Sequence, residues 1–220
     1  MSKNSANNLP IINDILDLLG KTYPDAHCEL NYRNPFELLV ATILSAQTTD
    51  QKVNQVTAEL FRHYPTPQKM LELTPGQLGD KIRTIGLFRT KAENILKTCR
   101  ILVEEYEGTV PAAMDKLLKL PGVGRKTASV VLANAFGIPA FPVDTHVLRV
   151  TRRLGLTTEK DPYHVERDLT DLIPPEQWID CHHRLIFHGR RLCKAKKPQC
   201  PVCPLNTHCP APENSVSENL

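Results

Sequence analysis

Residues 120–150 read LPGVGRKTASVVLANAFGIPAFPVDTHVLRV, and this stretch predicts how the chain folds around it. Gly122 and Gly124 allow the positive φ angles and close backbone approach that a tight turn between two helices requires. The helix that follows ends at Gly137, and Pro139 lies just beyond it, as is typical of a helix C-terminus. The pattern predicts a helix–turn–helix hairpin. The apolar face of its second helix comprises Ala128, Val131, Leu132, Ala135 and Phe136.

The start of this helix also favours a bound anion. Amide groups around Gly122, Val123 and Gly124 lie at a helix N-terminus, where unpaired N–H groups and the helix dipole attract negative charge. Arg125 adds a positive side chain at the same end. A phosphate of a nucleic-acid backbone would fit there without any base being read. The alternative is a hairpin that uses its glycines only to turn.

The composition limits the possible classes of protein. The 220 residues suffice for one large or two small domains, and the formal net charge is only +3. Any binding to nucleic acid must therefore come from local patches and not from a global positive field. No apolar run is long enough to cross a bilayer, and the polar start MSKNSANNLP lacks the apolar core of a signal peptide. We expect a soluble cytoplasmic protein that does not bind membranes.

Helical periodicity dominates the rest of the chain, and strand alternation is almost absent. The first predicted helix begins near Pro10 and stops at Gly20. Another opens with the capping-box spacing between Thr48 and Gln51. The polar tail at 211–220 is expected to be disordered. Further helices are expected at 35–46, 67–73, 75–84, 89–106, 145–154, 162–173 and 175–192, so the predicted fold class is all-α.

A second segment weakly repeats the glycine hairpin. TIGLFRTKAENI at 84–95 aligns with LPGVGRKTASVV at 120–131, which matches Gly86 to Gly122 and Ala92 to Ala128. One interpretation is a pair of hairpins that present their turns on the same side of the molecule. The other is that any helix–turn–helix needs a glycine. The sequence leaves both open.

Four of the seven cysteines crowd the C-terminus with the spacing Cys193-x6-Cys200-x2-Cys203-x5-Cys209. In a reducing cytosol such a set indicates a metal site and not disulfides. Zinc would bind four thiolates, but zinc sites usually pair two short CxxC knuckles, and this chain has one. The other cysteines, at positions 28, 99 and 181, are most simply small buried hydrophobes.

The hairpin string, the segments LSAQTTD at 44–50 and VDTHVLRV at 143–150, and the terminal cysteines together resemble the endonuclease III family of DNA glycosylases. The resemblance runs from about residue 11 to residue 209. It implies two helical domains with the active-site cleft between them. A six-helix barrel domain with the helix-hairpin-helix motif would span 28–138, and a discontinuous iron–sulfur cluster domain would combine 1–27 with 139–220. The four clustered cysteines would then hold a [4Fe-4S] cluster.

The resemblance also implies a reaction. A lysine amine is a nucleophile only when it is neutral, and a carboxylate can accept a proton or steady a developing cation on a sugar. Lys126 would attack C1′ of a damaged nucleotide with help from Asp144, form a Schiff base and break the 3′ phosphodiester by β-elimination. The implied substrates are oxidised pyrimidines and abasic sites in double-stranded DNA, bound by a monomer. Taken singly, Lys126 could be a phosphate contact and Asp144 a helix N-cap.

A base inside a duplex must be flipped out before any such attack. By resemblance, Gln47 fills the vacated stack and faces the orphan base, and Leu87 is an intercalating wedge. Without the resemblance, Gln47 would be a surface loop residue and Leu87 a buried turn residue. Asp50 and His146 match family positions that line the pocket.

The loop KAKKPQ between the first two clustered cysteines is strongly basic. Lys194 and Lys197 are expected to contact the DNA backbone and to give salt-dependent affinity that is independent of base sequence. The alternative is a solvated run of charges beside the cluster. The loop also contains Lys196, and three arginines lie just before it in the sequence: Arg184, Arg190 and Arg191.

Two other functions remain open from the sequence. An adenine-mismatch glycosylase shares the hairpin, the aspartate and the cluster, but its family carries another residue at the position of Lys126. A non-catalytic iron–sulfur DNA-binding protein would leave Lys126 and Asp144 without a task. Ser129 stands where many relatives carry asparagine, and its helical phase is expected to place it opposite Ala128 and Val131.

Overall fold

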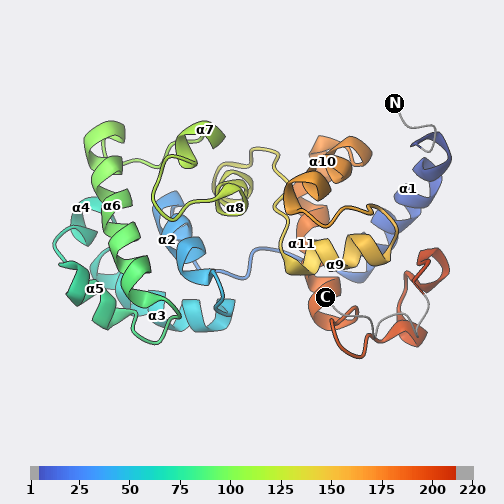
Figure 1. Cartoon of the computed structure of the whole chain (residues 1–220), viewed down its shortest axis with the longest axis horizontal. Helices are drawn as coiled ribbons and strands as arrows, with labels where there is room; N and C mark the ends of the chain where they lie inside the picture. The colour runs from blue at the N-terminus through green and yellow to red at the C-terminus, as the bar shows by residue number, and fades with distance from the viewer. Residues whose placement is uncertain (1–4, 212–220) are drawn as a thin grey trace. The chain divides into compact units, whose positions relative to one another are not determined.

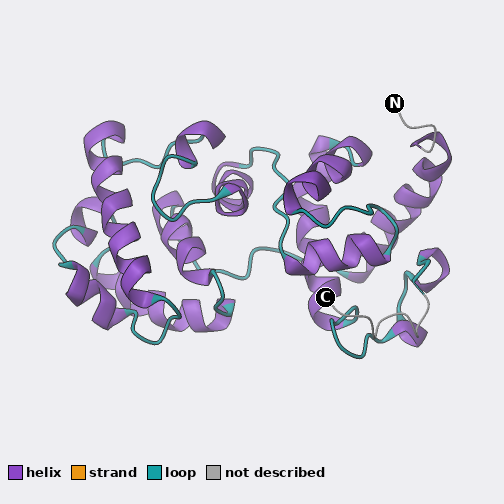
Figure 2. Ribbon diagram, in the orientation of Figure 1, coloured by secondary structure: helices purple, strands orange, loops and turns teal. Residues whose placement is uncertain are grey.

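The computed structural model describes residues 5–211, and within them the backbone is helical, with no β-strand (Figures 1 and 2). The predicted all-α class is therefore confirmed. The chain divides into two compact units, one of Cys28–Ile138 and one of Met1–His27 with Pro139–Leu220. In the described part of the chain, no helix is both long and apolar enough to cross a membrane. The tail that was expected to be disordered lies outside the described residues, apart from Ala211.

The first unit, here called the hairpin unit (28–138), is built around helix α2, Pro35–Ser45. Every side chain of α2 from Phe36 to Leu44 is buried, because the segment is almost continuously apolar. The longer helices that pack against α2 are α3 (Asp50–His63), α6 (Phe88–Tyr106) and α8 (Arg125–Phe136). The shorter helices are α4 (Pro67–Met70), α5 (Pro75–Lys81) and α7 (Met114–Leu117), of which α4 and α7 are single turns of four residues.

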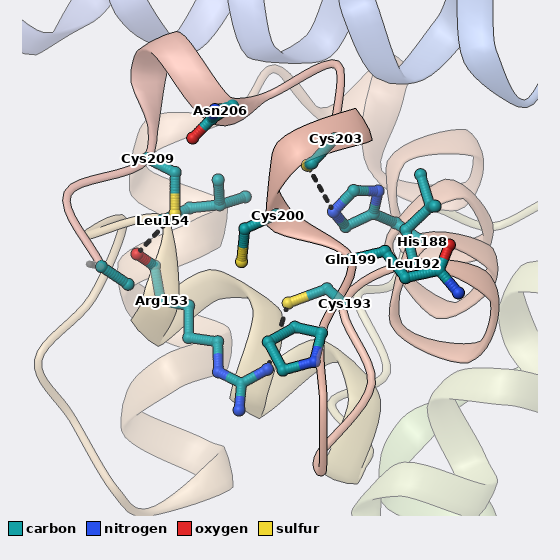
Figure 3. A pocket seen from close by; sticks show the side chains of 12 residues that line it. Arg153, Leu154, His188, Leu192, Cys193, Gln199, Cys200, Cys203, Asn206 and Cys209 are labelled. Atoms are coloured by element: carbon teal, nitrogen blue, oxygen red, sulfur yellow. Dashed lines mark hydrogen bonds between the residues drawn. The ribbon is translucent and has the colours of Figure 1, made fainter. Parts of the chain in front are cut away.

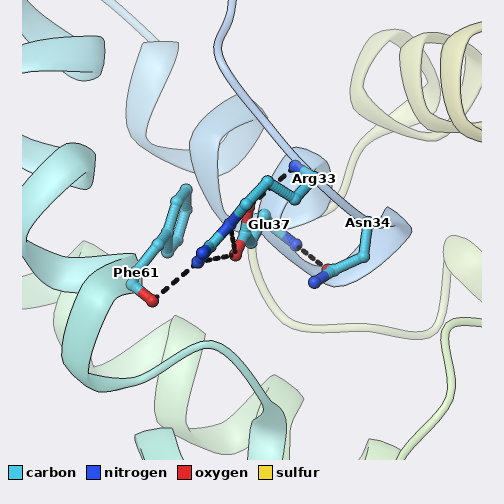
Figure 4. Close-up of polar contacts among 4 residues, drawn as sticks. All are labelled: Arg33, Asn34, Glu37 and Phe61. Carbon is cyan, nitrogen blue, oxygen red and sulfur yellow. Dashed lines mark hydrogen bonds and ion pairs between the residues drawn. The ribbon is translucent and has the colours of Figure 1, made fainter.

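A buried carboxylate fixes the N-terminus of α2. Glu37 is only 1% exposed, and the guanidinium of Arg33 donates to its Oε1 at 2.6 Å (Figure 4). The same nitrogen of Arg33 donates to the carbonyl of Phe61 in the last turn of α3 at 2.9 Å. Asn34 caps α2 by accepting from the Glu37 amide at 2.9 Å. These contacts tie the start of α2 to the end of α3.

The start of α3 differs from the prediction. Thr49, and not Thr48, is the N-cap, and its hydroxyl accepts from the Lys52 amide at 3.4 Å. The Thr48 amide instead donates to the carbonyl of Ser45 at 3.0 Å, so Thr48 belongs to the turn that closes α2. Two adjacent threonines offer the same capping chemistry, and the geometry of the preceding turn selects the second.

The burial of Ser129 could not be predicted from its helical phase. This residue is fully buried, and its Oγ has no hydrogen-bond partner among the described residues. Helix α8 packs against both α2 and α7, so more than one of its faces is covered. The continuous buried run from Ala128 to Ala133 reflects this covering. A face opposite Ala128 and Val131 is therefore part of the interior.

The second unit, here called the cysteine unit, combines α1 (Ser5–Thr22) with the chain after residue 138. Its other helices are α9 (Thr145–Arg153), α10 (Pro162–Leu172) and α11 (Trp178–Arg191). Helix α11 packs against α9 and α1, and fully buried side chains such as Ile15, Phe141 and Leu185 form the shared core. Three short 3-10 turns complete the unit: Pro175–Gln177, Cys200–Val202 and Asn206–His208.

Helix α1 does not stop at Gly20. It begins at Ser5, earlier than the expected start near Pro10, and continues to Thr22, whose hydroxyl donates to the carbonyl of Leu18 at 2.6 Å. A Cβ at position 20 would lie 3.5 Å from a guanidinium nitrogen of Arg184. That is an ordinary contact distance, so packing does not require glycine here, and the helix continues through this position.

Candidate active site

The turn between α7 and α8 requires glycine at one position. Gly122 has a φ of +79°, and a Cβ there would lie 3.2 Å from the side-chain amide nitrogen of Asn94. A residue with a side chain would be strained on this left-handed backbone and would have to displace Asn94 slightly, so glycine is favoured here. The side chain of Val123 is buried, and its amide donates to the carbonyl of Leu120 at 3.1 Å. Val123 thus supports the turn from inside.

Helix α8 starts with an uncapped N-terminus. Gly124 is the N-cap in an extended conformation, with φ −94° and ψ 178°, and no side chain caps the first amide groups. A Cβ built on Gly124 would have open space within 4 Å. Arg125 and Lys126, the first two residues of the helix, are both exposed. An anion that approached these amides would meet the helix dipole and two basic side chains.

The charges of Asp50 and Lys126 both act on the thiol of Cys28. Burial raises the pKa of this thiol most, the carboxylate of Asp50 raises it further, and the charge of Lys126 lowers it. Asp50 and Lys126 therefore both lie within electrostatic range of one side chain of the hairpin unit.

Gln47 and Leu87 share an unusual backbone conformation. Their φ angles are +56° and +57°, in a left-handed region that costs a residue with a side chain about 1 kcal/mol or more. Both side chains are exposed, and that of Leu87 is 66% exposed. Leu87 is therefore not a buried turn residue. Packing in the core therefore does not explain why the apolar side chain of Leu87 is exposed on a strained backbone.

The two similar hairpins differ in their turns. Helices α5 and α6 flank one turn, and α7 and α8 flank the other. The left-handed residue is Gly122 in the second hairpin but Leu87 in the first, where Gly86 is not among the residues with positive φ. The repeated pattern therefore extends to the helices but not to the conformation of the turn.

In the cysteine unit, Asp144 is the N-cap of α9. Its Oδ1 accepts from the amides of His146 and Val147, both at 2.8 Å. Both bonds use the same oxygen, and Oδ2 has no hydrogen-bond partner among the described residues. The capping role and a chemical role for Asp144 are therefore compatible, because each can use a different oxygen.

His146 lies beside this cap and is half-buried. Arg149 donates to its Nδ1 at 3.2 Å, which leaves the proton of a neutral ring on Nε2. Burial lowers the pKa of His146 most, Asp144 opposes this, and the charges of Arg149 and Arg190 lower it further. The ring is therefore held in its neutral form near neutral pH.

The four C-terminal cysteines line one pocket (Figure 3). Leu154, Leu192 and Pro198 contribute to its wall, and all four thiols are free. Burial raises the pKa of the thiols of Cys203 and Cys209, and the neighbouring cysteines raise it further. Bound cations would relieve this repulsion between thiolates. Within residues 5–211, no group of three or more His, Cys, Asp or Glu side chains is arranged to hold a metal ion.

Two arginines of α9 hold the loop between the first two cysteines. Arg149 donates from Nε to the carbonyl of Cys193 at 3.1 Å, and from NH2 to the carbonyl of Gly189 at 2.9 Å. Arg153 donates to Sγ of Cys193 at 3.3 Å (Figure 3). It also donates to the carbonyl of Lys194 at 2.8 Å. The helix capped by Asp144 and the cysteine loop are therefore one connected structure.

The lysines of this loop are exposed, whereas the arginines before it have partners within the unit. Lys194, Lys196 and Lys197 are all exposed, and Lys197 has a φ of +53°. Arg184 is paired with Asp180 at 2.9 Å. The guanidinium of Arg191 lies 4.3 Å from the ring centroid of Phe187. The loop lysines are therefore exposed beside Arg190 and Arg191, which are exposed as well.

The sequence analysis did not identify two buried basic residues, Lys91 in the hairpin unit and Arg149 in the cysteine unit. Lys91 is 6% exposed, and its Nζ donates to the carbonyls of Leu44 and Ala46 at 2.9 and 2.6 Å. A signal for it existed, because Lys91 precedes Ile95 by four residues and so falls on the apolar face of α6. Arg149 likewise occupies a buried position in α9.

Comparison with known proteins identifies similar families and structures. The family described as "HhH-GPD superfamily base excision DNA repair protein" matches residues 40–175. Endonuclease III of Bacillus subtilis (strain 168) is 51% identical over 203 residues, which cover 92% of this chain and 93% of that protein. Endonuclease III of Escherichia coli (strain K12) is 49% identical over 196 residues, which cover 89% and 93%.

Solved structures give the same result. A trapped covalent intermediate of endonuclease III with DNA superposes with a TM-score of 0.88 at 53% identity, over 90% of this chain and 94% of that one. A non-covalent endonuclease III–DNA complex has a TM-score of 0.90 at 51% identity, over 94% and 97%. A thermostable thymine-DNA glycosylase has a TM-score of 0.84 at 25% identity, over 93% and 97%.

Proposed function

This chain belongs to the endonuclease III family of HhH-GPD base excision DNA repair proteins, and from that membership we propose that it is a bifunctional DNA glycosylase and AP lyase. It excises oxidised pyrimidines from double-stranded DNA and cleaves on the 3′ side of the resulting abasic site. It acts as a monomer on chromosomal DNA at the nucleoid. The observation that carries the proposal is the exposed lysine in the first turn of α8, whose N-terminus no side chain caps.

The reaction begins at Lys126. The lone pair of its neutral Nζ attacks C1′ of the extruded nucleotide, and the N-glycosidic bond breaks with its electron pair leaving on the base. The sugar C1′–O4′ bond then opens, which gives an imine between Nζ and C1′. Loss of a proton from C2′ expels the 3′ oxygen and breaks the C3′–O3′ bond by β-elimination. Water finally releases the sugar fragment from Lys126.

Asp144 is proposed to serve the same sugar as Lys126. Its Oδ1 accepts two hydrogen bonds from backbone amides, so the orientation of the carboxylate is fixed. Oδ2 can then accept the proton that Nζ loses on attack, or stabilise positive charge that develops on the sugar. The neutral ring of His146 beside it is proposed to line the pocket, and Asp50 is proposed to line it near Lys126.

Gln47 and Leu87 are proposed to hold the duplex open. Their left-handed turns project exposed side chains, one able to hydrogen-bond and one apolar. Leu87 would enter the base stack as a wedge, and Gln47 would face the orphan base across the gap. Insertion of both would offset part of the unstacking cost of flipping.

The DNA backbone is proposed to bind at two places. The amides of the turn at Gly122, Val123 and Gly124, with Arg125, would hold a phosphate at the start of α8. Because the Val123 amide already donates to Leu120, its neighbours supply most of the free donors. Lys194 and Lys197 would add contacts to other phosphates that do not depend on base sequence.

Cys193, Cys200, Cys203 and Cys209 are proposed to hold a [4Fe-4S] cluster. The chemistry of the donor set fits this group, since four thiols line one partly apolar pocket, although within the described residues they are not drawn together into a metal-binding arrangement. A single CxxC pair with unequal flanking spacings favours iron–sulfur over zinc. Once bound, the cluster would supply no chemistry to the cleavage reaction. It would fix the basic loop that Arg149 and Arg153 already hold.

Reduction with borohydride in the presence of abasic DNA tests the proposed function. The wild-type protein should form a covalent adduct, and Lys126→Ala should form none while keeping its affinity for DNA. A non-catalytic DNA-binding protein would give no adduct in either form. An adenine-mismatch enzyme would excise adenine opposite an altered purine, and this activity should be absent here.

A further inference from the structure

Lys91 is a buried lysine for which the proposed reaction has no task so far. It lies in the first turn of α6, and its side chain is surrounded by the core of the hairpin unit. Burial lowers its pKa, which shows that the charged form is held at a cost. Its Nζ donates to two carbonyl oxygens, those of Leu44 at 2.9 Å and Ala46 at 2.6 Å.

These two carbonyls lie at the C-terminal end of α2, directly before Gln47. Helix α2 ends at Ser45, so its last carbonyls have no partner inside the helix. An ammonium group suits this position because the negative end of the helix dipole lies here. The contact with Ala46 fixes the peptide group that joins Ala46 to the left-handed Gln47.

The backbone of the same residue closes the turn at Leu87. The Lys91 amide donates to the carbonyl of Leu87 at 3.0 Å and so forms the first hydrogen bond of α6. No side chain caps this helix, because its N-cap is Leu87 itself in a left-handed conformation. One residue therefore bonds to both strained turns, through its side chain on one and its backbone on the other.

We propose that Lys91 is a positioning residue that holds the turns of Gln47 and Leu87 as one rigid unit, so that the two side chains enter an opened duplex together. This inference rests on the proposed function, because it names what keeps the gap-filling residues in register. Helix α2 is already fixed at its other end by Glu37 and Arg33, so Lys91 completes the support of the Gln47 turn. A flexible turn would lose more conformational freedom on insertion into the stack.

The test compares Lys91→Met with Lys91→Arg and with Lys97→Met, which removes an exposed lysine from the same helix. Each protein is assayed for excision of an oxidised pyrimidine from a duplex and for imine trapping on a single-stranded abasic oligonucleotide. Lys91→Met should slow duplex excision about 10-fold and leave single-strand trapping within about 2-fold of wild type. Lys91→Arg should recover most of the loss, and Lys97→Met should lose nothing.

A fluorescent 2-aminopurine placed opposite the lesion reports insertion without any chemistry. Its signal should develop more slowly with Lys91→Met than with Lys97→Met. If Lys91→Met does not fold, Lys91→Gln is measured in the same way. A further variant tests whether Lys91 acts only through Gln47 and Leu87. When both of these residues are changed to alanine, the additional change Lys91→Met should have no further effect on duplex excision.

Three results would overturn the inference: equal loss on the duplex and single-stranded substrates, no loss on either, or an additive effect in the double-alanine background. Failure of the proposed function is distinguishable, because wild-type protein would then give no imine adduct on the single-stranded substrate.

Discussion

The guanidinium of Arg153 lies 3.3 Å from Sγ of Cys193, and the same arginine donates to the carbonyl of Lys194 at 2.8 Å. Arg153 belongs to the last turn of α9, and Asp144 caps the first turn of that helix. One short helix therefore carries the proposed catalytic carboxylate at one end and holds the cysteine loop at the other. The cysteines would then stabilise the orientation of Asp144 as well as the basic loop.

The two roles of Asp144 can be separated by substitution. Asp144→Asn keeps an oxygen for the His146 and Val147 amides, so the free energy of unfolding should change by less than about 1 kcal/mol. Loss of the negative carboxylate should slow base excision by about 100-fold or more. Single-turnover excision assays and urea unfolding measure the two effects.

Asp161→Asn is the matched control for this change. Asp161 caps α10 in the same pattern, with Oδ1 accepting from the amides of Tyr163 and His164 at 3.0 and 3.2 Å, and this oxygen also lies 3.0 Å from Nδ1 of His164. Its substitution should leave excision unchanged. Equal activity of Asp144→Asn and Asp161→Asn would mean that Asp144 is only a cap.

The basic loop should act through salt-dependent affinity. Lys197→Ala should weaken binding to damaged and undamaged duplexes alike, and the slope of log affinity against log salt should fall by about 1. Lys160→Ala removes an exposed lysine of the same unit outside the loop and should change neither value. Binding titrations at several salt concentrations provide the measurement, and an unchanged slope for Lys197→Ala would remove the loop from the DNA contact.

Ser129→Ala should not destabilise the protein. The Ser129 hydroxyl is buried with no partner in the described structure, so its removal relieves a desolvation cost and adds a better helix former. The free energy of unfolding should stay the same or rise by up to about 1 kcal/mol. Urea denaturation at neutral pH tests this. A clear loss of stability would reveal a polar partner for the hydroxyl.

Acid should destabilise the cysteine unit through His183. Burial lowers the pKa of His183 from 6.5 to about 4, and His27 contributes further. The neutral ring is favoured in the folded state, so its stabilisation is full above pH 6.5 and is lost as the pH falls from 6.5 to about 4. The loss is on the order of 3 kcal/mol over that range. Unfolding free energies at pH 7.5, 6 and 5 should fall more steeply in wild type than in His183→Leu, and parallel curves would contradict this assignment.

The sequence was sufficient for features set by local chemistry. The hairpin turn, the helix that ends at Gly137, and the cap at Asp144 all follow from glycine, proline and aspartate at fixed spacings, and the structure contains each of them. The predicted end of the first helix at Gly20 was wrong, because a glycine inside a helix costs only about 1 kcal/mol and the residues after it continue the helix. Helical phase alone does not reveal that α8 is covered on several faces.

The role of Lys91 could not be read from the chain for a related reason. A lysine on an apolar face is compatible with a solvent-exposed side chain that reaches past the core. Only the folded unit shows that Leu44 and Ala46, more than forty residues earlier, present their carbonyls to it. Likewise, the capping pattern identified a threonine at the start of α3 but not which of two adjacent threonines makes the bond.

The most direct test of the proposed chemistry is to locate the covalent bond itself. Borohydride-trapped complex with abasic DNA is digested with nuclease and trypsin, and the modified peptide is sequenced by mass spectrometry. Modification of Lys126 blocks cleavage there, so the sugar remnant should be found on the peptide from Lys126 to Arg149. A remnant on any other lysine or on the N-terminal amine, or no remnant with fully active protein, would contradict the assignment of Lys126 as the nucleophile.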